Sequence, residues 1–274
     1  MLVARRRPDV SLADVAIVAT IAFMLLPLLW ALGASFKPVS SVFNLSPVPL
    51  PATVSNYTAA IARLSVARLL LNTLIMATLV TLLDLIVALP AAYFLVMAPG
   101  RKALVNAAIG IALLVPPEAL VVPDFVAVTH LGLRGTEPGL VLPQLWTCAL
   151  AAILLRDNVR LVPRSLIAAA QMDGATWWEV LRFVVLPQCR PALTAVGTLL
   201  FINSWNEYLW PLIIAGGPAS TTVQPGLALF NDPVNPAYGP LMAASVLTSL
   251  PVALLYVATS RRIVGAFLHA GVQS

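Results

Sequence analysis

The sequence predicts an all-α, polytopic membrane protein, and both its composition and its recurrent apolar stretches support this fold class. Of 274 residues, 60% are hydrophobic and 10% are charged, and the mean hydropathy is +0.93. Soluble domains carry about 25% charged residues. The polar surface is therefore too small to cover a water-soluble globule, and we expect lipid to surround most of the chain.

Six stretches are long enough for spanning helices, which need about 20 mainly apolar residues. They predict a single transmembrane domain over residues 1–274, with spans at about 11–32, 70–96, 103–128, 138–158, 191–215 and 238–260. Prolines interrupt several of these stretches. Membrane helices tolerate proline where neighbouring helices or water satisfy the freed backbone groups.

The distribution of Lys and Arg predicts that both termini are cytoplasmic, because cytoplasmic loops carry an excess of these residues. In this orientation the outer segments hold only four of the sixteen. The twelve on the inner side are Arg5, Arg6, Arg7, Arg101, Lys102, Arg156, Arg160, Arg164, Arg182, Arg190, Arg261 and Arg262. A signal peptide would also begin with basic residues, but its apolar region is usually about 7–15 residues long. We therefore expect an uncleaved first helix.

Two outer segments are long. The segment from Phe36 to Arg68 is rich in proline and is expected to run along the outer surface, with a short amphipathic helix near 57–68. The loop near 216–237 contains no Lys or Arg. It is expected to fold back toward a partner or the mouth of a pathway.

The inner loop at 159–190 is a charged, amphipathic segment in an otherwise apolar chain. Residues 165–171 favour a helix, and Asp173 and Gly174 favour a turn. Thr176 and Glu179 have the spacing of a capping box, which predicts a second helix. The apolar face of that helix consists of Trp177, Trp178, Leu181 and Val185. An alternative is an amphipathic loop that only anchors in lipid headgroups.

The segment Ala169-Ala170-Gln171-Met172-Asp173-Gly174-Ala175, followed by Leu186-Pro187 and Pro191, resembles the EAA loop of permease subunits in binding-protein-dependent ABC importers. In that family the loop forms a coupling helix that docks on a cytoplasmic ATPase subunit. The resemblance implies the docking residues Ala169, Ala170, Met172, Asp173, Gly174, Ala175 and Trp178. The glutamate of the family pattern is replaced here by Ala168, which predicts weaker or altered docking.

Other segments resemble the maltose and glycerol-3-phosphate importer group. They include Leu26–Trp30, Ser35–Pro38, Asn56-Tyr57, Leu71–Leu74, Ala91–Tyr93, Pro99–Arg101, Trp205–Leu212 and Arg261–Val264. The resemblance implies a multi-pass permease of the bacterial cytoplasmic membrane. It also implies a heterodimer with a second permease chain, two ATP-binding subunits and an extracytoplasmic solute-binding protein. The chain itself is expected to bind no cofactor, with ATP and magnesium held by the ATPase.

Ionisable residues inside spans usually face a cavity or a partner. Asn203, Asn206 and Glu207 are spaced to share one helix face, and Trp205 adds an aromatic ring. We expect these residues, with Glu118 and Asp124, to line a carbohydrate pathway, although helix packing or a heterodimer seam would need the same residue types. For Asp84 we favour helix packing.

The remaining patterns exclude several functions. No G-x-x-x-x-G-K-[ST] motif is present to hold ATP, and no metal-ligand spacing or catalytic triad occurs. The net charge of +5 comes from basic residues scattered in short loops, which is not typical of nucleic-acid binding. We expect transport of a carbohydrate or a related polyol or glycerophosphate, not catalysis. The alternatives are a standalone secondary transporter and an intramembrane enzyme using Asp84, Glu118 or Asp124.

Overall fold

A computed structural model describes residues 11–46, 48–63, 65–97, 102–217, 219–231 and 236–271. Within these ranges all regular elements are helices, which confirms the predicted all-α class. The chain forms two compact units. The first contains Met1–Ser65 and Leu227–Thr248, and the second contains Val66–Gly226 and Ser249–Ser274.

The first unit begins with α1, Leu12–Ser35, whose N-terminus is closed by a capping box between Ser11 and Asp14. Most of α1 is apolar and exposed, as expected for a helix that meets lipid. After α1 come the short η1, Val39–Ser41, and α2, Ser55–Arg63. The amphipathic helix expected at 57–68 is thus shorter and begins earlier than predicted.

Polar side chains organise the segment between α1 and α2. The Asn56 amide donates hydrogen bonds to the carbonyls of Ser35 and Lys37, at 2.9 and 2.7 Å. The Lys37 ammonium in turn donates to the carbonyls of Asn44 and Ser46, at 2.5 and 2.6 Å. Both side chains are almost fully buried. Because buried polar groups are costly unless they are paired, these bonds define the path of an otherwise irregular segment.

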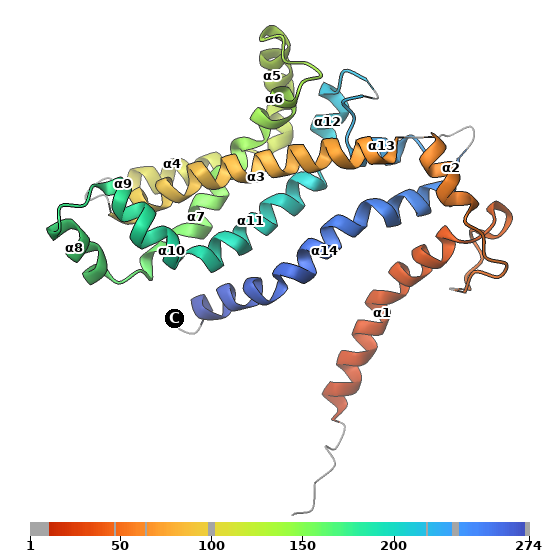
Figure 1. The fold of residues 1–274 in the computed structure, drawn as a ribbon, viewed down its shortest axis with the longest axis horizontal. Coiled ribbons are helices and arrows are strands. Elements are labelled where there is room, and N and C mark those ends of the chain that lie inside the picture. Colours follow the sequence, from red (N-terminus) through yellow and green to blue (C-terminus); the bar gives the residue numbers. More distant parts are fainter. Residues whose placement is uncertain are drawn as a thin grey trace, which may run out of the picture. The chain divides into compact units, whose positions relative to one another are not determined.

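The second unit is built around α3, Val66–Met97, which packs against α7, Thr147–Arg160, and α11, Arg190–Trp205 (Figure 1). Small residues allow these helices to approach closely. A side chain at Gly197 of α11 would place its Cβ 3.1 Å from Leu85 Cδ1 of α3. The core shared by the three helices also includes Ala88, Ala92, Ala151, Ala152 and Ala192, which is typical of membrane helix interfaces.

The third predicted span, 103–128, is not one helix. It consists of α4, Lys102–Leu114, and α5, Pro117–His130, and the two are bent by 86° at the break. Pro116 and Pro117 lack the backbone N–H groups that would continue the helix, which explains the position of the break. After α5 the chain continues through α6, Glu137–Val141, and η2, Leu142–Trp146, into α7.

The fifth predicted span, 191–215, is also interrupted. Helix α11 ends at Trp205, and the short α12, Leu209–Ile214, follows after a break. The chain then forms α13, Val223–Ala228, and α14, Tyr238–Gly271, which extends beyond the predicted end at residue 260.

The loop predicted at 159–190 contains α8, Arg164–Met172, and then α9, Trp177–Glu179, a π-helix η3 at Val180–Val185, and α10, Leu186–Gln188. The residues from Trp177 to Gln188 are bent by 81° from α11. Among the residues that the structure describes, four helical stretches are individually long and apolar enough to cross a membrane, at Leu12–Ser35, Val66–Met97, Glu137–Arg160 and Tyr238–Ser260. The predicted number of six is reached when each bent pair is counted as one crossing.

Candidate functional site: a carboxylate cavity and an exposed turn

Three carboxylates and two tryptophans line a small open cavity of about 70 Å³ in the second unit. Its wall is formed by α5, by η2 and by the segment that follows α11. The lining residues are Pro117, Glu118, Val121, Asp124, Pro143, Gln144, Trp146, Glu207, Leu209 and Trp210. Carboxylates accept hydrogen bonds from hydroxyls, and the faces of aromatic rings cover apolar groups. The lining therefore suits a polyhydroxylated solute.

The proline break positions two of the carboxylates. Helix α5 begins at Pro117, so Glu118 lies in its first turn. Glu118, Val121 and Asp124 follow one another at three-residue spacing, which places them on one face of the helix. Glu118 is exposed and Asp124 is half-buried. Without the break, α5 would not diverge from α4 and present this face to the cavity.

The third carboxylate lies where α11 stops. The N–H of Asn206 caps α11 by donating to the carbonyls of Ile202 and Asn203, at 3.1 and 3.2 Å. Glu207 follows outside the helix, and its Oε1 accepts a hydrogen bond from the N–H of Trp210 at 3.2 Å. The prediction that Asn203, Asn206 and Glu207 share one helix face is therefore wrong, because the helix ends before it reaches Glu207.

Only part of the predicted pathway set is brought together. Glu118, Asp124 and Glu207 line the cavity, whereas Asn203, Trp205 and Asn206 are not among its lining residues. The Trp205 ring is 3% exposed and stacks on Phe201, with ring centroids 5.6 Å apart. The side chain of Asn206 instead donates to the Ile202 carbonyl at 2.8 Å and accepts from Gln224 at 3.2 Å.

Of the polar and aromatic lining residues, Gln144, Trp146 and Trp210 lie outside the predicted pathway set. The Trp210 indole N–H donates to the Gly139 carbonyl at 3.0 Å, which fixes the ring against α6. Gln144 links η2 to α11, because its Oε1 accepts a hydrogen bond from the Ser204 hydroxyl at 2.9 Å. Trp210 is the second tryptophan of the Trp205–Leu212 segment, and its place in that segment could have indicated a role at the site. Nothing in the local sequence pairs Gln144 with Ser204, which is 60 residues away.

Asp84 is separate from the cavity. Its carboxyl group is fully buried in α3, and one oxygen accepts a short hydrogen bond from the Thr147 hydroxyl of α7. This contact between two packed helices supports the helix-packing interpretation.

Hydrogen bonds hold the loop after α12 against the N-terminal part of α3. The Asn72 amide donates to the carbonyls of Ala219 and Thr221, both at 2.9 Å. The Thr73 hydroxyl accepts the N–H of Val223 at 2.8 Å, which anchors the start of α13. The loop thus folds back onto α3 within this unit.

The turn between α8 and α9 is a Schellman motif. The N–H of Gly174 donates to the Gln171 carbonyl at 3.1 Å, and the N–H of Ala175 donates to the Ala170 carbonyl at 2.9 Å. Gly174 has φ of 84°, and a Cβ there would meet no atom within 4 Å. Glycine is therefore required by the backbone angle and not by lack of space.

The predicted docking residues are not equally accessible. Ala169, Met172, Asp173 and Gly174 are exposed at the turn, and the side chain of Met172 is 84% exposed. Ala170 and Ala175 are half-buried and pack against the core that α3, α7 and α11 share. Trp178 is half exposed. The base of this segment is thus part of the helical core, while the side chains at its tip are exposed.

The second helix of the turn begins as predicted and then departs from α-helical geometry. Thr176 and Glu179 form the expected capping box, and the hydrogen bonds from the backbone and hydroxyl of Thr176 lower the pKa of the Glu179 carboxyl. From Val180 the chain becomes a π-helix. Because a π-helix changes the angle between successive residues, the predicted apolar face divides: Leu181 and Val185 are buried, while Trp177 and Trp178 are half exposed.

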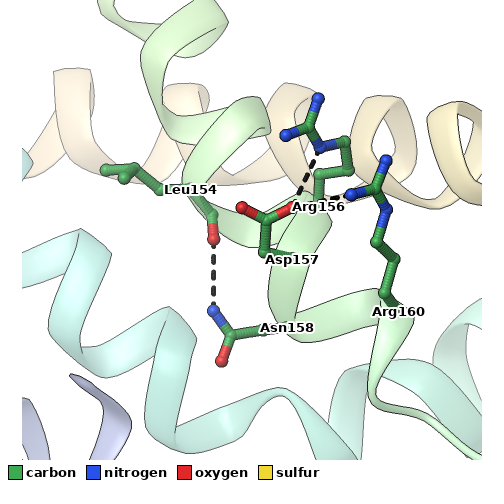
Figure 2. A network of polar contacts seen from close by, with 5 residues as sticks. All are labelled: Leu154, Arg156, Asp157, Asn158 and Arg160. Atoms are coloured by element: carbon green, nitrogen blue, oxygen red, sulfur yellow. Dashed lines mark hydrogen bonds and ion pairs between the residues drawn. The ribbon is translucent and has the colours of Figure 1, made fainter. Parts of the chain in front are cut away.

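Polar side chains form a network in the last turn of α7, just before α8 (Figure 2). The Asp157 carboxylate accepts from Arg156 Nε at 3.1 Å and from Arg160 Nη1 at 3.3 Å. The Asn158 amide donates to the Leu154 carbonyl at 3.1 Å. Exposed ion pairs contribute about 0–1 kcal/mol, so this network supports the last turn of α7 only modestly.

Comparison with known proteins identifies the family. The family described as "Binding-protein-dependent transport system inner membrane component" matches residues 2–265. The chain belongs to this family. It is 30% identical over 275 residues to the trehalose transport system permease protein SugB of Mycobacterium tuberculosis, covering 98% of this chain and 99% of that protein. It is 26% identical to the lactose transport system permease protein LacG of Rhizobium radiobacter, covering 96% of each.

The fold is also found in solved structures. A chain from the crystal structure of a bacterial ABC transporter involved in the import of the acidic polysaccharide alginate superposes on this permease with a TM-score of 0.80 and 21% identity, covering 93% of this chain and 99% of that one. A chain of the MetNI methionine ABC transporter gives a TM-score of 0.57 at 20% identity. The family is one of transport permeases in the inner membrane and not of enzymes.

Proposed function

We propose that this permease is the membrane subunit of a carbohydrate importer, with both termini cytoplasmic and the turn at 172–175 docked on an ATPase subunit. We further propose that its two compact units act as one transmembrane domain. A second related permease chain, two ATPase copies that hold ATP and magnesium, and an extracytoplasmic solute-binding protein would complete the importer. The named transport of trehalose and lactose by its relatives supports a carbohydrate solute.

One observation carries the proposal: an exposed turn is rigidly joined to the helix that ends at the cavity. Ile167, Val180 and Leu181 flank the turn and are buried in the same core as Val196 and Leu200 of α11. Close-packed cores transmit displacement because they deform little. Helix α11 has 16 residues and therefore spans roughly 24 Å from this segment to the break beside Glu207.

This connection supports alternating access. ATP-driven closure of the ATPase would move the turn, and α11 would carry the motion to Glu207 and Trp210 at the cavity. A partner can shift the equilibrium between two states only by its different affinity for each. The Schellman turn gives such a partner a well-defined shape to bind.

The cavity supports a neutral polyhydroxylated solute over an anionic one. Its lining contains Glu118, Asp124 and Glu207 but no Lys or Arg, so it disfavours a second negative charge such as a glycerophosphate. Ligand pockets usually enclose about 300–1,000 Å³, several times the volume found here. We therefore infer that the second permease chain supplies the rest of the pathway.

The function is tested by purifying and reconstituting the transporter from its native membrane. We expect the chain to co-purify with an ATPase and a second permease chain. Uptake into vesicles should require ATP and the solute-binding protein. ATP-independent uptake by the isolated chain would show instead a standalone secondary transporter.

The docking role is tested at Gly174. Gly174→Val places a β-branched residue at positive φ, which costs about 1–2 kcal/mol of backbone strain and distorts the turn. We expect normal membrane insertion but ATP hydrolysis that no longer drives uptake. Gly132→Val is the matched control, because Gly132 has φ of 67° and equally open space at the end of α5. Normal uptake by Gly174→Val, or equal loss in both variants, would contradict docking at this turn.

A further inference from the structure

An apolar groove of about 350 Å³ lies between α3, the α9–η3 segment and α11. Nine of its ten lining residues are uncharged, and the tenth is Arg182. The lining includes Leu82, Leu85, Ile86 and Pro90 of α3 and Trp178 of α9. The groove is separate from the carboxylate cavity, with which it shares no lining residue. Its volume is within the usual range of ligand sites, about 300–1,000 Å³.

Arg182 is the charged group of this apolar groove, and no acidic side chain of the described residues is paired with it. The ion pairs of Asp157 with Arg156 and Arg160 do not include Arg182. Its guanidinium lies over the Phe183 ring, 5.5 Å from the centroid. A guanidinium matches the geometry of phosphate, to which it donates paired hydrogen bonds.

The groove has an apolar end and a polar end. Trp177 packs on Phe94 with ring centroids 5.2 Å apart, so α9 lies beside the C-terminal part of α3. Gly197 of α11 instead approaches Leu85 of α3. Trp178 and Arg182 thus lie toward the side that carries the exposed turn, and Leu82 and Leu85 lie toward the middle of α3. Trp is enriched at membrane interfaces, where its ring meets the headgroups.

The length of the groove corresponds to one lipid leaflet. From Leu82 to Pro90 it follows α3 for eight residues, or roughly 12 Å. Half of a typical hydrocarbon core is about 15 Å thick. Pro90 has no N–H to offer the carbonyl of Ile86, and both residues line the groove. An acyl chain placed here would cover α3 at its irregular turn.

We propose that this groove binds one anionic glycerophospholipid, with an acyl chain along Leu82–Pro90 and its phosphate on Arg182. The inference rests on the orientation given under the proposed function, in which the groove opens to the cytoplasmic leaflet. That leaflet carries anionic lipids, and each Lys or Arg near its surface strengthens their binding. The bound lipid would contact both α3 and η3, and so join the docking segment to the membrane helices.

The test measures lipid bound to the intact transporter. The purified complex is exposed to phosphatidylglycerol or to phosphatidylcholine, and native mass spectrometry counts the lipid retained on this chain. We expect phosphatidylglycerol to be retained preferentially. Arg182→Gln should weaken its binding about fivefold, which is the effect of one basic residue near an anionic surface, and Arg182→Lys should restore much of it. Arg190→Gln, an exposed arginine outside the groove, should weaken binding less, because it does not reach a phosphate held in the groove.

A second pair of variants tests the groove itself. Ile86 is 66% exposed and lines the groove, whereas the adjacent Val87 is 52% exposed and does not. Ile86→Trp should fill the groove and displace the lipid, and Val87→Trp should leave binding unchanged. Because both positions are exposed, neither substitution disturbs the core.

Several outcomes would overturn the proposal. Equal retention of both lipids that is insensitive to Arg182→Gln would show an unspecific annular lipid. Displacement of phosphatidylglycerol by inorganic phosphate alone would show an anion site without an acyl chain. A cross-link from Ile86→Cys to another protein chain would show that the groove is a subunit interface. If the unmodified transporter shows no preference for phosphatidylglycerol but still takes up carbohydrate with ATP, only this inference is overturned. If the ATPase is absent from the purified complex, the proposed function is overturned.

Discussion

The buried carboxyl of Asp84 and the three carboxyls of the cavity lie in the same compact unit, yet their surroundings differ. Asp84 is fully buried and bonded to Thr147 on a neighbouring helix. Glu118, Asp124 and Glu207 line an open cavity, and of these three only Glu207 accepts a hydrogen bond from a described residue, donated by the Trp210 N–H. In a membrane an acidic residue can therefore join helices or face a solute. The contact, and not the residue type, distinguishes the two roles.

The largest expected effect is reversal of charge in the cavity. Asp124→Lys should lower the rate of carbohydrate uptake about tenfold or more, because a misplaced charge in a binding site costs several kcal/mol. Assembly of the complex should be unchanged, since the Asp124 side chain forms no hydrogen bond or ion pair with another described residue. Uptake into vesicles and gel filtration of the purified complex measure the two effects. Thr129→Lys, on an exposed position of the same helix, is the control, and equal loss in both variants would exclude a cavity role for Asp124.

Substitution of Asp84 should lower the stability of the protein and leave solute recognition nearly unchanged. Asp84→Ala removes the partner of Thr147 and should lower the free energy of unfolding by about 1–3 kcal/mol, with little change in the KM of the surviving transporter. Asp84→Asn keeps an acceptor and should retain most of the stability. Thermal unfolding in detergent gives the stability, and a shift in KM would assign Asp84 to the solute pathway instead.

A double-mutant cycle sharpens the Asp84 result. Asp84→Ala combined with Thr147→Val should show a coupling energy of about 0.6–1.7 kcal/mol, the range for hydrogen bonds between membrane helices. Additive effects would mean that the contact between α3 and α7 contributes nothing as a pair.

The smallest expected effect is at Asn206, whose side chain bonds only to Ile202 and Gln224 among the described residues. Asn206→Ala should change the KM for carbohydrate less than about twofold, or less than half a kcal/mol, while Glu207→Ala should raise it clearly. Parallel uptake assays at varied solute concentration compare the two. A larger effect of Asn206 would support its predicted place in the pathway, although it does not line the cavity.

The corrections follow from the kind of pattern that each prediction used. Spacing along one helix predicted that Asn203, Asn206 and Glu207 share a face, but spacing contains no information on where a helix ends. The two prolines at 116–117 were visible in the sequence, yet their 86° bend depends on how α4 and α5 pack. By contrast the turn at 173–176 was predicted closely, because Gly174 and the Thr176–Glu179 pair act within a few residues.

The sequence by itself determined that this chain lies in a membrane, that it is helical, and that it has a sharp turn after Met172. These properties depend on composition and on contacts between near neighbours, which local chemistry dictates. Only the tertiary structure decided which polar groups meet. Asp84 with Thr147, Gln144 with Ser204, and Trp210 with Gly139 are 60 or more residues apart. Such pairs exist because helix packing brings them together, and no periodicity within one segment encodes that packing.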